Sequence, residues 1–282
     1  MDKIKFTKMN GLGNDFIILD YDEFEKTKMS PDKLALKLCN RNFSIGADGL
    51  IIVNKDTKVA DISWIFYNSD GSIAEMCGNG IRCFSRYIHD KKLIDKNEFT
   101  VETKAGIKTV SLVSDDRVKV NMGSPILEPN KIPIDNATNT AVYNTNDGKT
   151  FDIYAVSMGN PHCIIFVKEN SKELALKYGR EIETDKLFPN KTNVEFVEVL
   201  SRKEVVVNVW ERGCGITLAC GTGSCATVVA GVLKGYLDNK VKVRLPGGEL
   251  EIEWNGNASE LNKDVYMTGK AEYSFIGEID II

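Results

Sequence analysis

Histidine is scarce in this chain: its 282 residues include two, His89 and His162. Zinc sites draw on several cysteine and histidine ligands at short spacings, which the cysteines here do not follow. The Cys-x-x-Cys pair of thiol redox proteins is also missing, as is an evident lysine motif for pyridoxal phosphate. We therefore expect neither a metal nor another cofactor.

Long apolar runs and an excess of one charge are missing too. No apolar run approaches the roughly 20 residues that span a bilayer, and the first six residues alternate like a strand and hold no signal-peptide core. The net charge is −4, with lysine and arginine scattered, which argues against binding to nucleic acid or a membrane. Seven cysteines, an odd number, indicate thiols in a reducing cytosol. We expect a cytoplasmic globular protein with room for two domains.

What the chain does have is a cysteine-glycine motif that occurs twice. The first copy is Met76-Cys77-Gly78-Asn79-Gly80, and the second, Ala219-Cys220-Gly221-Thr222-Gly223, follows 143 positions later. Apolar residues at helical spacing come after each copy. Each cysteine is therefore predicted at a helix start, where unpaired N–H groups and the positive dipole end stabilise an anion. A thiol in that place ionises more readily.

Other matches recur in the same order. Gly13-Asn14-Asp15-Phe16 corresponds to Gly159-Asn160-Pro161-His162, 146 positions later, and Leu34-Ala35-Leu36-Lys37 recurs 140 positions later. Six such matches favour a tandem duplication. A stretch with three prolines and little periodicity, 123–150, reads as the crossover. We expect a first repeat over 1–122, completed by a C-terminal strand over 271–282, and a second repeat over 123–270.

Local patterns predict more strands than helices. The predicted helices run from Pro31 to about Asn40 with Ser30 as N-cap, from the first cysteine to about Asp90, over 171–178, and from the second cysteine to about Lys234. The second cysteine helix is apolar on nearly every face, which indicates burial. We therefore predict an α+β fold in which each half wraps strands around one central helix. The predicted strands are 4–8, 15–20, 50–53, 61–67, 98–104, 107–113, 117–122, 152–157, 162–167, 194–200, 205–210, 241–245, 248–254, 264–268 and 271–282.

The repeat carries a chemical implication. Two similar halves that face each other bring equivalent points together across the cleft between them, so Cys77 and Cys220 would approach one substrate atom from opposite sides. Inversion at a carbon needs such opposed groups, because one removes a proton while the other delivers one. The helix N-termini would also donate N–H groups to a carboxylate whose charge grows as the α-proton leaves.

These motifs resemble the diaminopimelate epimerase family over essentially the whole chain. The Cys-Gly-x-Gly element alone is shared with proline racemase-like relatives, which carry histidine where this chain has Asn79. The resemblance implies a cofactor-independent isomerase that converts LL-2,6-diaminopimelate to the meso form, in the synthesis of lysine and peptidoglycan precursors. The segments that carry it are Asn10-Gly11-Leu12-Gly13-Asn14-Asp15-Phe16, the two cysteine motifs, Met158-Gly159-Asn160-Pro161-His162-Cys163, Glu211-Arg212-Gly213 and Leu245-Pro246-Gly247-Gly248.

The resemblance also implies roles for individual residues. Cys77 and Cys220 would be the two bases, and His162 and Glu211 would modulate the pKa of a neighbouring thiol. The substrate α-carboxylate would lie on the backbone of Gly78, Asn79, Gly221 and Thr222 and on the Thr222 hydroxyl. Asn14, Asn68, Asn160, Asn193, Glu211 and Arg212 would bind the remaining amino and carboxylate groups, a mixture of donors and acceptors that suits a diamino diacid.

Some positions depart from the family pattern, and some alternatives stay open. Gly49 stands where some relatives carry glutamine, and Ile216 where many carry glutamate. The other cysteines, Cys39, Cys83, Cys163, Cys214 and Cys225, are expected to be packing residues. A racemase of another amino acid, proline for example, a thiol redox protein and a non-catalytic amino-acid-binding module remain alternative readings. The sequence also leaves the oligomeric state open, and a homodimer is one possibility.

Overall fold

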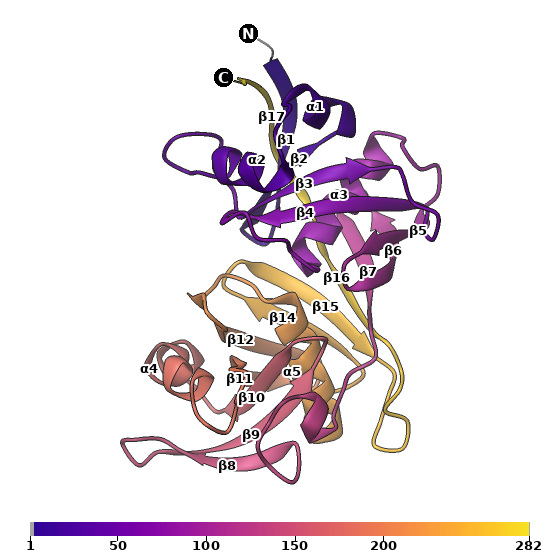
Figure 1. Ribbon diagram of the computed structural model, residues 1–282. Coiled ribbons are helices and arrows are strands. Elements are labelled where there is room, and N and C mark those ends of the chain that lie inside the picture. Colours follow the sequence, from indigo (N-terminus) through magenta and orange to yellow (C-terminus); the bar gives the residue numbers. More distant parts are fainter. Residues whose placement is uncertain (1–2, 282) are drawn as a thin grey trace. The chain divides into compact units, whose positions relative to one another are not determined.

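The computed structural model describes residues 3–281. Met1, Asp2 and Ile282 lie outside the described residues, and with them the outermost positions of the repeat and strand predictions. The chain divides into two compact units, one of Met1–Val120 with Gly269–Ile282 and one of Asn121–Thr268. Figure 1 labels the helices and strands of both units.

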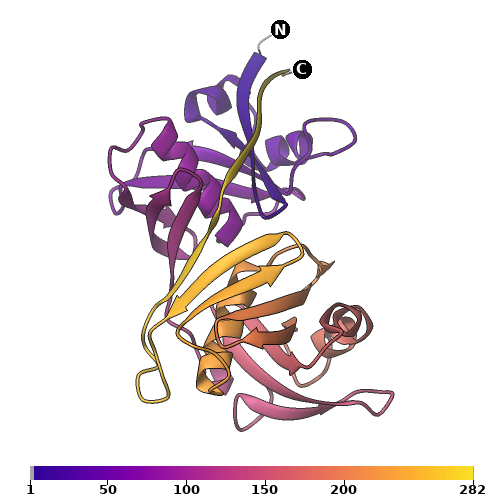
Figure 2. The ribbon, with the colours of Figure 1, turned by 180° about the vertical axis from the view of Figure 1, so that it is seen from behind.

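The first unit is built on strands around one long helix. Its helices are α1 (Tyr21–Lys26), α2 (Pro31–Leu38) and α3 (Gly78–Asp90), and its strands include β17, which returns from the far end of the chain to pair with β1 (Figure 2). Its strands are β1 (Lys3–Gly11), β2 (Asn14–Leu19), β3 (Gly49–Asn54), β4 (Ile62–Asn68), β5 (Glu98–Thr103), β6 (Gly106–Ser114), β7 (Arg117–Gly123) and β17 (Glu272–Asp280).

The second unit has the same kind of content. Its helices are α4 (Ser171–Glu183) and α5 (Gly221–Leu233), with a short 3-10 helix, η1 (Pro129–Lys131). Its strands are β8 (Thr140–Asn144), β9 (Thr150–Ser157), β10 (Pro161–Val167), β11 (Asn193–Ser201), β12 (Glu204–Glu211), β13 (Gly215–Ile216), β14 (Lys240–Leu245), β15 (Gly248–Trp254) and β16 (Val265–Lys270).

Strand pairing follows one order in both units. In the first, the pairs from β1 to β6 run antiparallel, parallel, antiparallel, parallel and antiparallel. In the second, the pairs β9–β10, β10–β11, β11–β12, β12–β14 and β14–β15 run in that same order. A repeated alternation of five pairings is the topological signature of a duplicated unit. The predicted α+β class with an internal duplication is confirmed.

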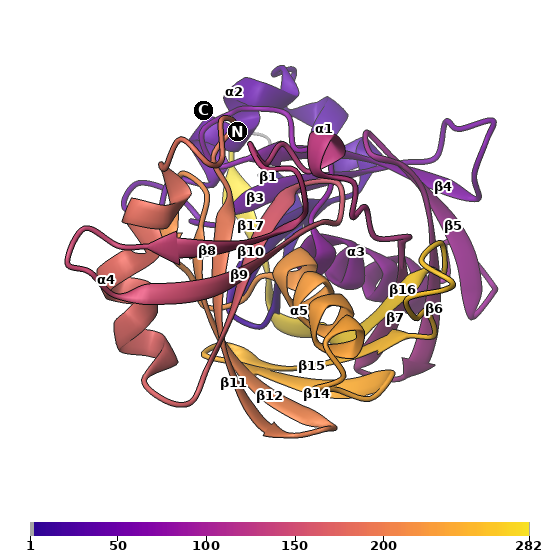
Figure 3. The ribbon, with the colours of Figure 1, turned by 90° about the horizontal axis from the view of Figure 1, so that it is seen from below.

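Each unit buries its cysteine helix under corresponding strands. Helix α3 packs on β1, β2 and β6, and α5 packs on β9, β10, β11 and β15 (Figure 3). Almost every residue of α5 from Gly221 to Gly231 is buried, as its all-round apolar sequence predicts. Helix α3 is buried nearly as completely, and it includes a fully buried arginine, Arg82. The start of each helix is therefore fixed by the unit's core.

Four short elements and one helix end differ from the sequence prediction. Helix α1, the 3-10 helix η1 and strands β8 and β13 were not predicted, since each is too short to develop a clear period. Helix α4 continues to Glu183, well past the predicted end at 178. A glycine often marks a helix end, but Gly179 lies within α4. A Cβ at this position would come within 2.4 Å of the Trp210 side chain, so the position has room only for glycine. Close packing on β12 explains this glycine.

Candidate active site

Cys77 is the N-cap of α3, with extended backbone at φ −137° and ψ 122°. Its sulfur accepts a hydrogen bond of 3.4 Å from the backbone N–H of Gly80, one of the helix's unpaired donors. The thiol also contacts Asn14, donating to the side-chain oxygen at 3.4 Å. The same oxygen accepts from the Asn79 amide at 3.3 Å. Asn14 and Asn79 therefore lie next to Cys77.

Hydrogen bonds from Arg82 fix the first turn of α3. Its guanidinium donates to the Gly78 carbonyl and to the Asn79 side chain, both at 2.9 Å, and to the Lys270 carbonyl at 3.1 Å. Because Arg82 is fully buried, these bonds carry the stabilisation of its charge. They also fix the Asn79 amide so that it faces Asn14. The sequence analysis did not single out Arg82.

Cys220 repeats the cap geometry in the second unit. It is the N-cap of α5 at φ −124° and ψ 109°, and its sulfur accepts from the Gly223 N–H at 3.4 Å. The Thr222 hydroxyl lies 3.6 Å from the sulfur, and the Asn160 amide donates to that hydroxyl at 3.3 Å. In both units, then, an asparagine contacts the residue two positions after the cysteine: Asn14, the first residue of β2, and Asn160, which directly precedes β10.

The surroundings of Cys220 hold three titratable side chains. Burial raises the pKa of the Cys220 thiol well above its usual range, and the charges of Glu211 and Glu195 raise it further. Burial also raises the pKa of Glu211, against the effect of hydrogen bonds from Thr217 and Cys220. Cys220 is therefore stabilised as the protonated thiol, the form that can act as an acid.

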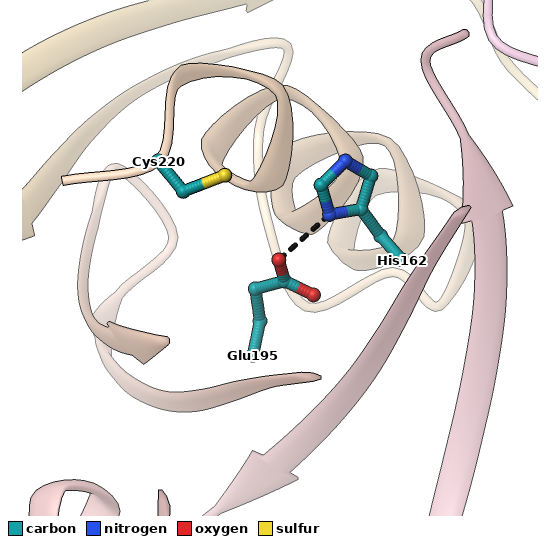
Figure 4. Close-up of side chains that lie close together, drawn as sticks. All are labelled: His162, Glu195 and Cys220. Carbon is teal, nitrogen blue, oxygen red and sulfur yellow. Dashed lines mark hydrogen bonds and ion pairs between the residues drawn. The ribbon is translucent and has the colours of Figure 1, made fainter. Parts of the chain in front are cut away.

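The third titratable side chain is His162, which is paired with Glu195 (Figure 4). His162 Nδ1 lies 2.7 Å from Glu195 Oε1, and both side chains are completely buried. His162 Nε2 lies 3.1 Å from the Asn160 oxygen. In Figure 4 the Cys220 sulfur lies on the carboxyl side of the pair. The structure thus brings His162, Asn160, Thr222, Glu211 and Cys220 together in the second unit.

His162, Glu195 and Cys220 are also the residues that could hold a metal ion. Their ligand atoms lie within 4.8 Å of one another. Two of the three ligand atoms are already hydrogen-bonded to each other, however, and the chemistry of a carboxyl–imidazole pair accounts for the arrangement. We therefore interpret this cluster as a proton-bearing pair next to a thiol.

The remaining predicted substrate-binding residues have other partners as well. Asn68 donates to the Ser72 hydroxyl at 2.9 Å. Asn193 is buried, donates to the Pro161 carbonyl at 2.8 Å and accepts from the Arg212 N–H at 2.9 Å. The Arg212 guanidinium is exposed and donates to the Asn190 carbonyl at 3.3 Å. Asn193 therefore anchors the turn that presents Arg212.

The seven cysteines are all thiols. Cys39, Cys83, Cys163 and Cys225 are buried, as predicted for packing residues. For Cys214 the packing prediction is wrong: this residue is exposed, because it lies in the turn between β12 and β13.

Sequence comparisons identify the family. The family model for diaminopimelate epimerase matches residues 6–128 and 154–274. The chain belongs to the diaminopimelate epimerase family. It is 47% identical to the diaminopimelate epimerase of Halothermothrix orenii, with 99% of both chains covered. It is 49% identical to that of Desulfitobacterium hafniense, with 97% of both covered, and 46% identical to a chloroplastic one of Oryza sativa subsp. japonica, with 97% of this chain and 79% of that one covered.

Solved structures with much lower identity share the fold of this diaminopimelate epimerase family member. A phenazine biosynthesis protein of Bacillus anthracis aligns with a TM-score of 0.70 at 16% identity, over 100% of both chains. A hydroxyproline epimerase of Agrobacterium vitis aligns with a TM-score of 0.69 at 13% identity, over 98% of this chain and 92% of that one. Among the described residues, no helix combines the length and the apolar character needed to cross a bilayer.

Proposed function

We propose that Cys77 and Cys220 are the two acid–base groups with which this chain inverts the α-carbon of diaminopimelate. As a member of the diaminopimelate epimerase family, the chain is an isomerase that interconverts LL- and meso-2,6-diaminopimelate, a reaction of lysine biosynthesis. In the proposed mechanism one sulfur, as thiolate, removes the α-proton, and the other, as thiol, protonates the opposite face. The roles exchange when the reaction runs backwards.

One observation supports the proposal above the others. In each unit a cysteine is the N-cap of the buried central helix, and its sulfur accepts the N–H of the residue three positions on, at 3.4 Å. The donors and the helix dipole favour the thiolate form of each sulfur. At Cys220 they oppose, without outweighing, burial and the charges of Glu211 and Glu195, which raise the pKa of the thiol. A binding module has no need of two such groups, and a redox protein has no need of them at equivalent places in a duplicated chain.

The same helix starts supply the proposed carboxylate site. The backbone N–H groups of Gly78, Asn79, Gly221 and Thr222 belong to the first turns of α3 and α5. Such donors stabilise the charge that builds on the substrate carboxylate as the α-proton leaves. Asn14, Asn68, Asn160, Asn193, Glu211 and Arg212 are proposed to bind the other polar groups of the substrate, and His162 and Glu211 to modulate the thiols.

Further proposals concern the chain as a whole. We propose two repeats, over 1–122 with 271–282 and over 123–270, with the substrate bound where the two cysteine helices begin. We also propose that the enzyme is cytoplasmic. A homodimer stays a prediction.

The test is turnover of LL-diaminopimelate in deuterated water, with no cofactor added. We expect the meso form to appear with one solvent deuteron at the inverted carbon, and activity to be unchanged by EDTA. Proline is the control substrate, and we expect no exchange of its α-proton. A requirement for pyridoxal phosphate, loss of activity with EDTA, or turnover of proline in place of diaminopimelate would refute the proposal.

A further inference from the structure

Glu195 and His162 meet because two parallel strands set their register. In the pairing of β10 with β11, His162 lies opposite Asn193 and Ile164 opposite Glu195. Side chains two apart on a strand share a face, so His162 and Glu195 both lie on the face that packs against α5. A Cβ on Gly223 would come within 2.4 Å of Glu195 Oε1 and 3.2 Å of the Cys220 sulfur. The carboxyl group therefore lies against the first turn of α5.

The first unit shows what this fold carries at the same positions without the pair. There β2 pairs with β3 in parallel, with Phe16 opposite Gly49 and Ile18 opposite Ile51. By this register Phe16 corresponds to His162, and Ile51 to Glu195. Both counterparts are apolar and buried. A hypothetical Cβ on Gly80, the counterpart of Gly223, lies an ordinary 3.4 Å from the Phe16 ring. In this fold, an apolar pair is thus sufficient at the two strand positions that hold His162 and Glu195 in the second unit.

We propose that Glu195 is a positioning residue for Cys220, acting through His162. The inference rests on the proposed role of Cys220 in catalysis. Glu195 holds His162 Nδ1, which directs Nε2 to the Asn160 oxygen. Asn160 then presents its amide to the Thr222 hydroxyl beside the sulfur. A chain of four contacts thereby links a buried carboxyl group to the orientation of the residues around one thiol.

Burial of Glu195 and His162 costs free energy, so their presence is better explained by a role other than stability. Burying a carboxyl group and an imidazole costs more than burying the apolar pair that occupies these positions in the first unit. The second carboxyl oxygen, Oε2, is buried and has no hydrogen-bond partner, which adds to this cost. Accordingly, burial raises the pKa of Glu195, and the attraction of His162 opposes that rise.

The charges that face Cys220 set the expected pH dependence. They are Glu195 on β11, Glu211 on β12 and His162 on β10, with the N-terminus of α5 beneath the sulfur. The carboxylates of Glu211 and Glu195 both oppose formation of the Cys220 thiolate. Glu195→Gln removes one of these charges and keeps a side-chain amide that can hydrogen-bond with His162 Nδ1. The pKa of Cys220 should therefore fall, while its packing is kept.

The test is a double-mutant cycle on kcat/KM, with its pH profile. We expect Glu195→Gln to lower kcat/KM by about 10- to 100-fold and to move one limb of the profile to lower pH by about one unit. At the pH optimum we expect kcat/KM of His162→Asn combined with Glu195→Gln to be no lower than that of His162→Asn alone, because the positioning effect of Glu195 acts through His162. The shift of the pH limb comes instead from the charge of Glu195 itself and should persist in the double variant. Glu198→Gln is the matched control, since it lies on the same strand, faces the other way and keeps its acceptor for the Ser171 N–H.

A second variant separates positioning from folding. His162→Phe with Glu195→Ile installs the pair of the first unit, which should fold with an unchanged melting temperature and show a large loss of kcat. The proposal is overturned if Glu195→Gln leaves the pH limbs in place, or if the losses from Glu195 and His162 multiply. Failure of the proposed function is distinguishable, because a Cys220→Ala variant that kept its activity would refute that function whatever Glu195 does.

Discussion

The two cysteine helices have the same geometry at the cap and different chemistry beneath it. Cys77 and Cys220 cap α3 and α5 with the same extended backbone and the same 3.4 Å bond from the glycine three residues on. His162 and Glu195 lie next to Cys220, and the equivalent positions of the first unit hold Phe16 and Ile51. Arg82 lies along the first helix.

This difference separates what the fold requires from what the chemistry requires. Under the proposed mechanism, the cap is common to both units because a thiol near a helix N-terminus is the reactive element. The residues next to the two thiols differ because, under the same proposal, the thiols start from different protonation states: burial and two carboxylates raise the pKa of Cys220. A reaction that starts with one thiolate and one thiol needs such an asymmetry.

The largest expected effect comes from removing either thiol. Cys77→Ala and Cys220→Ala should each lower kcat for diaminopimelate by at least about 1,000-fold, because neither group inverts the carbon alone. The double variant should lose little more, as expected for groups that act as a unit. Steady-state kinetics on the four proteins measures this. If the two losses multiplied, the thiols would have independent roles.

A smaller effect should come from the equivalent glycines of the two helices. Gly223→Ala puts a methyl group into the Glu195 carboxyl, so we expect a loss in kcat of about 100-fold, as for an active-site displacement of about 1 Å. Gly80→Ala meets only ordinary contacts with Phe16 and should stay within about threefold of wild type. Equal losses of kcat in both variants would contradict the claim that Glu195 near Gly223 and Phe16 near Gly80 have different roles.

The smallest effect is expected at the buried cysteines one turn further on. Cys83→Ala and Cys225→Ala should keep kcat within about threefold and cost about 1 kcal/mol of stability each.

The Cys83 variant also tests a pH dependence. Burial raises the pKa of Cys83 from 9.0 to about 12. Its stabilising contribution is therefore complete below pH 9 and is lost as the pH rises towards 12, because only the unfolded chain releases the proton there. In Cys83→Ala, the fall in unfolding free energy above pH 9 should be shallower by up to about 1.4 kcal/mol per pH unit. Urea unfolding at several alkaline pH values measures the slope, and an unchanged slope would contradict the burial argument.

Local signals in the sequence predict much of the fold. The starts of α3 and α5, the start of α2 at Pro31 and the longer strands follow from turn residues and periodicity. Ser30 is the N-cap position of α2, but its side chain makes no cap hydrogen bond. The end of α4 does not, since Gly179 is explained by Trp210, which lies on a distant strand. Short β8 gives no period to detect.

The candidate site divides in the same way. The cysteines, Asn14, Asn79, Asn160 and Thr222 lie in motifs that a single sequence displays, and the structure brings the three members of each unit's set together. Glu195 was missed, although its place two residues after Asn193 on a strand puts a charge on a buried face. Its role depends on the register of β10 with β11, which the sequence pattern does not set.

The most direct measurement of the central claim, that both thiols serve one carbon, is peptide mapping of air-oxidised enzyme without reductant. If both sulfurs come within about 3–3.5 Å of that carbon, then without substrate they can meet, and dioxygen can oxidise the two thiols to a disulfide while it is reduced to hydrogen peroxide. We expect inactivation to coincide with a Cys77–Cys220 crosslink, dithiothreitol to restore activity, and diaminopimelate to protect. Inactivation with a different linkage, or with none between these two residues, would contradict the claim.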